Sequence, residues 1–322
     1  MMIDIFTHVV PQKYKIALGK VDPRAAATTD QVPTLSDMAK RFAILDRYPD
    51  MKQVLTFTLT GSLILNDPAH AVDFAKRAND EMAALVEKHP DRFAAGVASV
   101  PTTDMDAALA ELDRAIGQLG LKGVLLFTPW KGTPLCLNNA GPIFEKMAAY
   151  DLPVWIHPMR PIERDDYRAF YLDHVFGWPY QSTAAMTYLV LDGIFDRWPR
   201  SKIVIHHCGA LAPFFDERIT ESFDSSATIF DMKYAGKLEK PLIEYFKMFY
   251  TDTALSGGTA GLMCGHALLG TRQLLFGSDM PYDGQFGDRI LRNTITSVEK
   301  MTIGRPDKEM IYSGNAMKLL KL

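Results

Sequence analysis

The feature that most constrains this chain of 322 residues is a repeated alternation of short apolar runs with longer amphipathic ones. Short runs rich in β-branched and aromatic residues predict strands at 2–6, 53–59, 93–99, 122–127, 153–157, 202–207, 248–253 and 273–277. Several of these runs are apolar on both faces, which is typical of buried parallel strands. Amphipathic patterns predict helices at 35–48, 67–89, 104–119, 141–150, 181–197, 258–269, 284–300 and 307–320.

The order of strand then helix, repeated along the chain, predicts an α/β fold of the (β/α)8 TIM-barrel type rather than a doubly wound sheet. We expect residues 1–322 to form one barrel domain with three insertions. These insertions are 11–34 after the first strand, 158–180 after the fifth and 223–246 after the sixth. The first two would leave the C-terminal face of the barrel, where loops build the active site of such folds.

The composition excludes several function classes. A net charge of −3 without any run of Lys and Arg argues against a nucleic-acid partner. The three cysteines form no C-x-x-C pair, so we expect no disulfide framework and a cytoplasmic location. We find neither a signal-peptide pattern nor an apolar run of ~18 residues, so no membrane partner is predicted. No G-x-G-x-x-G motif follows a strand, which argues against a nicotinamide or flavin cofactor.

Polar side chains that can bind a metal fall at the ends of four predicted strands. His8 follows the first strand, His157 ends the fifth, His207 ends the sixth and Asp279 follows the eighth. In a parallel barrel these ends meet at one mouth. Imidazole nitrogen and carboxylate oxygen suit one divalent ion such as zinc or manganese, which polarises a substrate oxygen or lowers the pKa of bound water. Each residue alone could be a core histidine or a helix cap, but their joint placement predicts a site.

Three segments carry a resemblance to a known family. The segment 3–11 (IDIFTHVVP) resembles the opening motif of the amidohydrolase superfamily. The segments 189–214 (LVLDGIFDRWPRSKIVIHHCGALAPF) and 275–282 (LFGSDMPY) resemble its decarboxylase group. That group includes α-amino-β-carboxymuconate-ε-semialdehyde, γ-resorcylate and 5-carboxyvanillate decarboxylases. The order and spacing of the motifs match this group over nearly the whole chain.

The resemblance implies a role for each matching position. His8, His157 and Asp279 match metal ligands. His207 matches the catalytic histidine, and a histidine suits acid–base work because its ordinary pKa lies near neutrality. Asp279 is a second candidate for the catalytic proton donor. His206 lies one residue earlier, so we expect it to point to the other side of the strand as a buried or helix-facing histidine.

Further residues are candidates for substrate binding. Arg218 matches an arginine that reaches a neighbouring subunit's site and binds the substrate carboxylate, which implies a homodimer; a surface ion pair is the alternative. Trp130 and Trp178 could stack on an aromatic substrate. Arg160 and Arg41 could bind a carboxylate group. Ordinary loop packing and solvation are the alternatives for these residues.

One position departs from the resemblance. The family has His or Glu where this chain has Phe6, which cannot bind a metal. We therefore expect weakened metal affinity. Three outcomes stay open: an extra water completes the site, another group such as His207 is recruited, or the protein has lost its metal or its catalysis.

The preferred hypothesis is metal-dependent, non-oxidative decarboxylation of a small aromatic or unsaturated carboxylic acid. The second hypothesis is metal-dependent hydrolysis of an amide, a lactone or a ring C–C bond. The third is a non-catalytic binding protein, which only Phe6 supports. Release of carbon dioxide indicates the first reaction, and net uptake of water indicates the second.

Overall fold

The structure is a computed structural model, and it describes the chain except for residues 59–66, 130–132, 136–139, 160–168 and 231–237. The chain divides into two compact units. The first unit comprises Met1–Leu125, Thr253–Thr259 and Leu275–Leu322, and the second comprises Leu126–Asp252 and Ala260–Leu274. The organisation as one domain stays a prediction.

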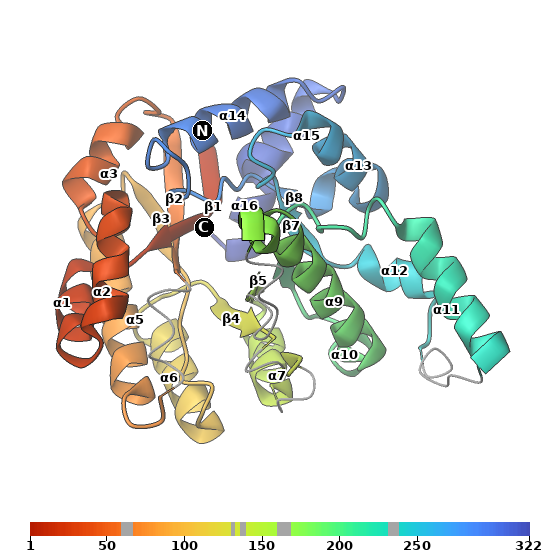
Figure 1. The fold of residues 1–322 in the computed structure, drawn as a ribbon, viewed down its shortest axis with the longest axis horizontal. Coiled ribbons are helices and arrows are strands. Elements are labelled where there is room, and N and C mark those ends of the chain that lie inside the picture. Colours follow the sequence, from red (N-terminus) through yellow and green to blue (C-terminus); the bar gives the residue numbers. More distant parts are fainter. Residues whose placement is uncertain (59–66, 130–132, 136–139, 160–168, 231–237) are drawn as a thin grey trace. The chain divides into compact units, whose positions relative to one another are not determined.

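Every predicted strand is present. The strands are β1 (Met2–Val9), β2 (Met51–Phe57), β3 (Phe93–Gly96), β4 (Val124–Thr128), β5 (Val154–Pro158), β6 (Ile203–Ile205), β7 (Tyr250–Asp252) and β8 (Leu274–Leu275). They form a three-stranded sheet in the order β1-β2-β3 and a five-stranded sheet in the order β4-β5-β6-β7-β8 (Figure 1). The ladders β1–β2, β2–β3, β5–β6 and β6–β7 are parallel. Parallel strands in sequence order, with helices between them, confirm the predicted fold class.

In the first unit, the helix predicted to begin at Asp104 is present. α6 (Met105–Gly117) begins after Asp104, whose carboxylate accepts the backbone N–H of Ala107 at 3.0 Å, as an N-cap does. The others are α1 (Gln12–Val21), α2 (Pro23–Thr28), α3 (Met38–Leu45), α5 (Ala71–Lys88), α14 (Asp288–Glu299), α15 (Arg305–Glu309) and α16 (Asn315–Leu320). The predicted helix at 307–320 is present as one unbroken helical run, in which the π-helical turn Met310–Gly314 lies between α15 and α16.

Most helices of the second unit begin beside a glycine or a proline. They are α7 (Gly141–Tyr150), α9 (Trp178–Leu191), α10 (Ile194–Arg197), α11 (Asp216–Phe230) and α12 (Leu242–Phe246), and most of α13 (Thr259–Leu269). The predicted helix at 181–197 is broken, because Gly193 has a positive φ of 75° that ends one helix and starts the next. α11 also begins before the insertion that was predicted at 223–246.

The insertion at 11–34 is largely helical and contributes to the core. Tyr14 of α1 is fully buried, and its ring packs edge-on against Phe57 at 4.7 Å and Phe74 at 5.2 Å between centroids. These rings belong to a cluster that also includes Val9 at the end of β1. Because the same core holds the end of β1, the insertion fixes the strand that carries His8. Among the described residues, no helix is long and apolar enough to cross a membrane.

Candidate active site

In the first unit, the end of β1 is paired with the segment that follows β8. His8 donates its backbone N–H to the carbonyl of Met280 at 2.7 Å, and Asp279 donates its own to the carbonyl of Phe6 at 3.0 Å. A parallel bridge joins Thr7 to Met280. This pairing fixes the backbones of His8 and Asp279, the two predicted metal ligands, relative to each other.

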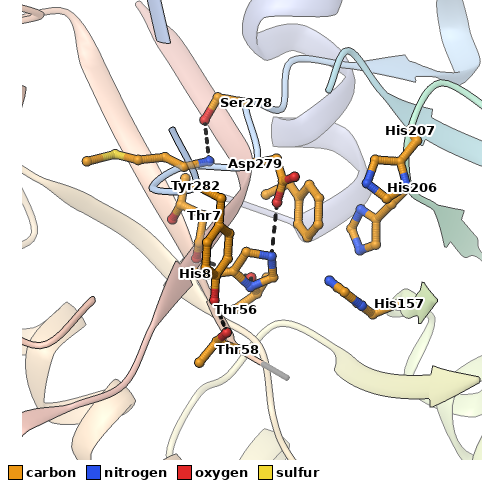
Figure 2. A network of polar contacts seen from close by, with 12 residues as sticks. Thr7, His8, Thr56, Thr58, His157, His206, His207, Ser278, Asp279 and Tyr282 are labelled. Atoms are coloured by element: carbon orange, nitrogen blue, oxygen red, sulfur yellow. Dashed lines mark hydrogen bonds and ion pairs between the residues drawn. The ribbon is translucent and has the colours of Figure 1, made fainter. Parts of the chain in front are cut away.

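The side chains of His8 and Asp279 meet as metal ligands would. His8 Nε2 lies 3.1 Å from Asp279 Oδ1 (Figure 2). Two donors that share one ion at about 2.1 Å each lie roughly 3 Å apart. His8 is buried, and 22% of the Asp279 side chain is exposed, so the pair opens toward solvent only through the carboxylate.

The hydroxyl of Thr56 favours one tautomer of His8. Thr56 Oγ1 donates to the carbonyl of Thr7 at 3.1 Å, so its oxygen is free to accept from His8 Nδ1, 3.4 Å away. A neutral His8 with its proton on Nδ1 presents the lone pair of Nε2 to the carboxylate oxygen. Two hydrogen-bond acceptors 3.1 Å apart repel each other unless a cation, either a proton or a metal ion, lies between them. The chemistry of this pair therefore fits a metal.

Phe6 supplies an apolar wall beside His8. Its side chain is fully buried, and the two rings meet edge-on with centroids 4.7 Å apart. A phenyl ring has no donor atom, so the position that carries a ligand in the resembled family contributes none here.

Buried charges brace the two ligand-bearing segments. The Asp4 carboxylate accepts the backbone N–H of Ser278 at 2.9 Å and also its hydroxyl. Arg41 donates to the carbonyl of His8 at 2.7 Å and to Gln53 Oε1 at 2.8 Å. Burial raises the pKa of Asp4 to about 7 and lowers the pKa of Arg41 to about 10. Arg41 is fully buried and supports the backbone of His8, while its binding of a substrate carboxylate stays a prediction.

Tyr282 was not singled out from the sequence, although it lies in the motif at 275–282. Its ring is 5.3 Å from that of His8, and its hydroxyl is hydrogen-bonded to Thr58 (Figure 2). Desolvation raises the pKa of the Tyr282 phenol, and the Asp279 carboxylate raises it further. The phenol therefore stays protonated at neutral pH.

In the second unit, His157 has a defined tautomer. Its Nδ1 is 2.7 Å from the carbonyl of Pro158, and because a carbonyl only accepts, Nδ1 carries the hydrogen. The ring lies against Phe127 and Trp178, with centroids 5.2 Å away in both cases. Trp178 Nε1 is buried without a hydrogen-bond partner among the described residues. The indole thus lies beside a proposed ligand, and its stacking on an aromatic substrate stays a prediction.

His206 and His207 share the carboxylate of Asp252. His206 Nδ1 lies 2.7 Å from Asp252 Oδ2, and the backbone N–H of His207 donates to Oδ1 at 3.0 Å. His206 is buried, as expected, yet its ring is 5.6 Å from that of His157 and so is not helix-facing. His207 is half-buried with a positive φ of 63°, which departs from strand geometry. The alternation of side chains between the two faces of a regular strand therefore does not hold for His206 and His207 at the end of β6.

Comparisons with known proteins decide the family. The family model described as amidohydrolase matches residues 3–322. The chain belongs to the amidohydrolase family. This amidohydrolase is 28% identical to the γ-resorcylate decarboxylase of Polaromonas sp. over 88% of its own length and 87% of the relative's.

Solved structures of similar proteins share the fold. The 5-carboxyvanillate decarboxylase of Sphingomonas paucimobilis has a TM-score of 0.85 at 24% identity, covering 100% of this chain and 99% of that one. A dihydroxybenzoic acid decarboxylase of Polaromonas sp., solved with manganese and 2-nitroresorcinol, has a TM-score of 0.81 at 24% identity, covering 100% and 97%.

The remaining predicted site residues of this amidohydrolase are placed only in part. Trp130 and Arg160 lie outside the described residues. Arg218 is exposed on α11. In the described part of the chain, no three His, Cys, Asp or Glu side chains are gathered so as to hold a metal ion. His8 and Asp279 belong to the first unit and His157 to the second, so the three-ligand set stays a prediction.

Proposed function

We propose that this amidohydrolase is a metal-dependent, non-oxidative decarboxylase of a small aromatic or unsaturated carboxylic acid. The observation that carries the proposal is the 3.1 Å approach of His8 Nε2 to Asp279 Oδ1. The decarboxylase relatives favour this reaction over hydrolysis of an amide, lactone or C–C bond.

The proposed ligands of one divalent ion are His8, His157 and Asp279. Manganese in the dihydroxybenzoic acid decarboxylase supports an ion of this class, and zinc is the other candidate. When bound, the ion would polarise a substrate oxygen and stabilise the negative charge that develops in the reaction.

The chain's own residues would move the proton. Loss of carbon dioxide from an aromatic acid requires a proton on the carbon that bears the carboxylate. The C–C bond then breaks, and its electron pair returns to the ring. We propose Asp279 or His207 as the donor, because both are partly exposed titratable groups.

Other residues would bind and orient the substrate. The buried indole N–H of Trp178 is available to a substrate oxygen, and its ring offers an apolar face beside His157. Arg218, from a partner subunit in a homodimer, and Arg160 are the proposed carboxylate-binding groups. We propose a cytoplasmic enzyme with no nucleic-acid or membrane partner.

Product analysis tests the proposal. The protein, loaded with Mn²⁺ or Zn²⁺, is given hydroxybenzoic acids labelled with ¹³C in the carboxyl group, and labelled carbon dioxide is measured. Asp279→Asn should lower kcat by about 10²–10⁴-fold, the usual range for loss of an acid–base group. Asp73→Asn, which changes a surface ion pair with Arg77, is the matched control. Uptake of ¹⁸O from water without carbon dioxide release would instead establish hydrolysis.

A further inference from the structure

Three consecutive backbone amides around Asp279 are bonded to β1 or to a side chain that β1 holds. Ser278 donates its N–H to Asp4 Oδ1 at 2.9 Å, and Asp279 donates its own to the carbonyl of Phe6 at 3.0 Å. The N–H of Met280 donates to Ser278 Oγ at 3.1 Å, and that hydroxyl in turn donates to Asp4 Oδ2. All five residues belong to the first unit. The Asp4 side chain therefore holds the segment that carries the Asp279 carboxylate.

The backbone of Asp279 has a conformation that needs such support. Its φ is 67°, in the left-handed region that is unfavourable for a residue with a side chain. Such conformations persist only where the surrounding structure determines them, and they are concentrated at functional sites. Here the carboxylate is turned toward His8, with Oδ1 3.1 Å from Nε2 (Figure 2). The bonds to Asp4 thus act beside the residue whose orientation defines this contact.

Strand β1 is irregular next to Asp4. It pairs with β2 at Asp4 and next at Thr7, so that β1 advances three residues where β2 advances two. A bulge of this kind is often found next to an active site, where it re-aims a side chain. Within it, Asp4 Oδ1 also accepts the backbone N–H of Phe6 at 3.3 Å. One carboxyl group therefore joins the strand that leads to His8 with the segment that carries Asp279.

The stability of the fold does not by itself explain a carboxyl group at position 4. The side chains of Asp4 and Ser278 are fully buried. A buried carboxylate needs hydrogen bonds and a nearby positive charge to compensate for its lost hydration. The bonds from Ser278 and Phe6 and the charge of Arg41 supply this compensation. Well-packed apolar residues would need none of these partners and are often at least as stable as a buried charged pair.

We propose that Asp4 is a positioning residue for the metal-binding pair, which sets the orientation of the Asp279 carboxylate toward His8 through Ser278. The proposal rests on the metal site of the proposed function. Asp4 acts through its bonds to the backbone and to the Ser278 hydroxyl. Without them, the Asp279 backbone can leave its left-handed conformation, and the carboxylate is no longer held beside His8.

Metal affinity measures this role without relying on catalysis. The apo protein is titrated with Zn²⁺ against a coloured chelator, and with Co²⁺ while its visible absorption is recorded. Asp4→Ala should weaken Zn²⁺ binding about 10- to 100-fold, the usual cost of losing a group that orients a ligand, and should change the Co²⁺ spectrum. Asp4→Asn keeps an oxygen for the amides of Phe6 and Ser278, so it should retain most of the affinity.

Asn79→Ala is the matched control for a loss of stability. Asn79 is another fully buried polar residue of the first unit, and its side chain is bonded to the backbone of Ser99 and to Glu111. Its removal should lower the free energy of unfolding but leave the Zn²⁺ affinity and the Co²⁺ spectrum unchanged. An equal loss of affinity in Asn79→Ala and Asp4→Ala would assign the effect to general destabilisation and overturn the proposal.

A double-mutant cycle tests the route through Ser278. Ser278→Ala removes the hydroxyl that joins Asp4 to the amide of Met280, and it should weaken Zn²⁺ binding less than Asp4→Ala does. In the double variant, the loss of affinity should be smaller than the product of the two single losses, because both changes break one network. Independent effects that multiply in full would contradict this route. Ser278→Ala also carries the comparison with Asn79→Ala if Asp4→Ala does not fold.

The variants of Asp279 separate the failure of this inference from the failure of the proposed function. If Asp279→Ala loses Zn²⁺ while Asp4→Ala and Ser278→Ala bind it like the wild type, the metal site stands and Asp4 does not position it. If Asp279→Ala itself binds Zn²⁺ normally, the metal site of the proposed function is wrong and this inference fails with it. Circular dichroism of each variant establishes that the affinities refer to folded protein.

Discussion

At the scale of single residues, the candidate site combines a histidine–aspartate pair that could bind a metal with an apolar neighbour, Phe6. His8 and Asp279 approach as two ligands of one ion would, while the adjacent Phe6 fills its position with hydrocarbon. An apolar ring beside two polar donors lowers the local polarity and adds no charge. The outcome should be a site that holds a cation less tightly than a site with four protein ligands.

The Phe6 position can be tested directly. Phe6→His should raise the affinity for Zn²⁺ or Mn²⁺ by about tenfold or more, because the size of an outer-shell effect sets a lower bound for an added ligand. The measurement is metal content after purification at equal ion supply, together with a chelator titration. Phe6→Leu keeps the position apolar and should show no gain. Equal occupancy in Phe6→His and the wild type would count against the expectation.

At the scale of elements, the strand ends are tied together by buried polar groups rather than by apolar contacts alone. Asp4 on β1 accepts from Ser278 beyond β8, and Asp252 at the end of β7 accepts from the turn after β6. Each carboxylate joins two segments that are remote in sequence. The ends of these strands should therefore respond to changes of charge.

The pKa of Asp4 makes stability depend on pH. It rises from the ordinary value of 3.8 to about 7 in the folded protein, mainly because of burial. The folded state then binds the proton more tightly than the unfolded state, so the stabilising contribution is complete below about pH 4 and is lost as the pH rises through 7. The free energy of unfolding of the wild type relative to Asp4→Asn should fall over this interval by a few kcal/mol, roughly one per pKa unit. Urea unfolding at a series of pH values measures it; parallel curves would refute the assignment.

Packing between α13 and the turn after β6 gives a second test at this scale. A Cβ added at Gly265 would lie 2.3 Å from Cys208 Sγ, which no packed structure tolerates. Gly265→Ala should cost about 1–3 kcal/mol in the free energy of unfolding, as overpacking does. Combining it with Cys208→Ala removes the clashing sulfur and should recover most of that cost. If the double variant is no more stable than the single one, the contact is not the cause.

The elements were largely predictable from the sequence, and the reasons for the misses are local. Strand runs and the Asp104 cap are encoded in neighbouring residues, so they were found. The break at Gly193 has a visible sequence cue, a glycine inside a helical pattern, but its positive φ depends on the packing of both helices. The helices of the insertion at 11–34 depend on Tyr14 reaching a core made by distant residues.

The site was predictable as far as strand ends define it. His8 and Asp279 were found because both follow strands, and their contact confirms that they lie together. The His206–Asp252 pair was missed, although Asp252 also ends a predicted strand and could have been noticed by the same rule. Which face His206 takes depends on the left-handed backbone that follows it, and only Gly209 hints at that turn in the sequence.

At the scale of the whole molecule, the proposed homodimer would let one subunit complete the site of another. Arg218 is exposed on α11, where a second copy could reach it. Family membership shows the fold, but it does not show an assembly. A complementation experiment separates a shared site from a self-sufficient one.

Mixing two inactive variants tests for a shared site. Arg218→Ala and Asp279→Asn should each lose most decarboxylase activity. If Arg218 acts across a dimer interface, a mixed dimer has one site with both changes and one site with neither, so activity returns on mixing after subunit exchange. If Arg218 acts within its own subunit, every site keeps one defect and no activity returns. Arg24→Ala, at an exposed position of α2, is the control.

The turn after β6 has one more consequence. His207, Cys208 and Ala210 all have φ between 56° and 63°, a conformation that costs each non-glycine residue roughly 1–2 kcal/mol. Asp252 restrains two of these residues through their amides and orients the ring of His206 with its other oxygen. The Asp252 carboxylate thus contacts both a turn with an unfavourable backbone conformation and the imidazole of His206. Because one carboxylate contacts both groups, a change that moves the His206 ring would also shift the backbone of the turn that carries His207.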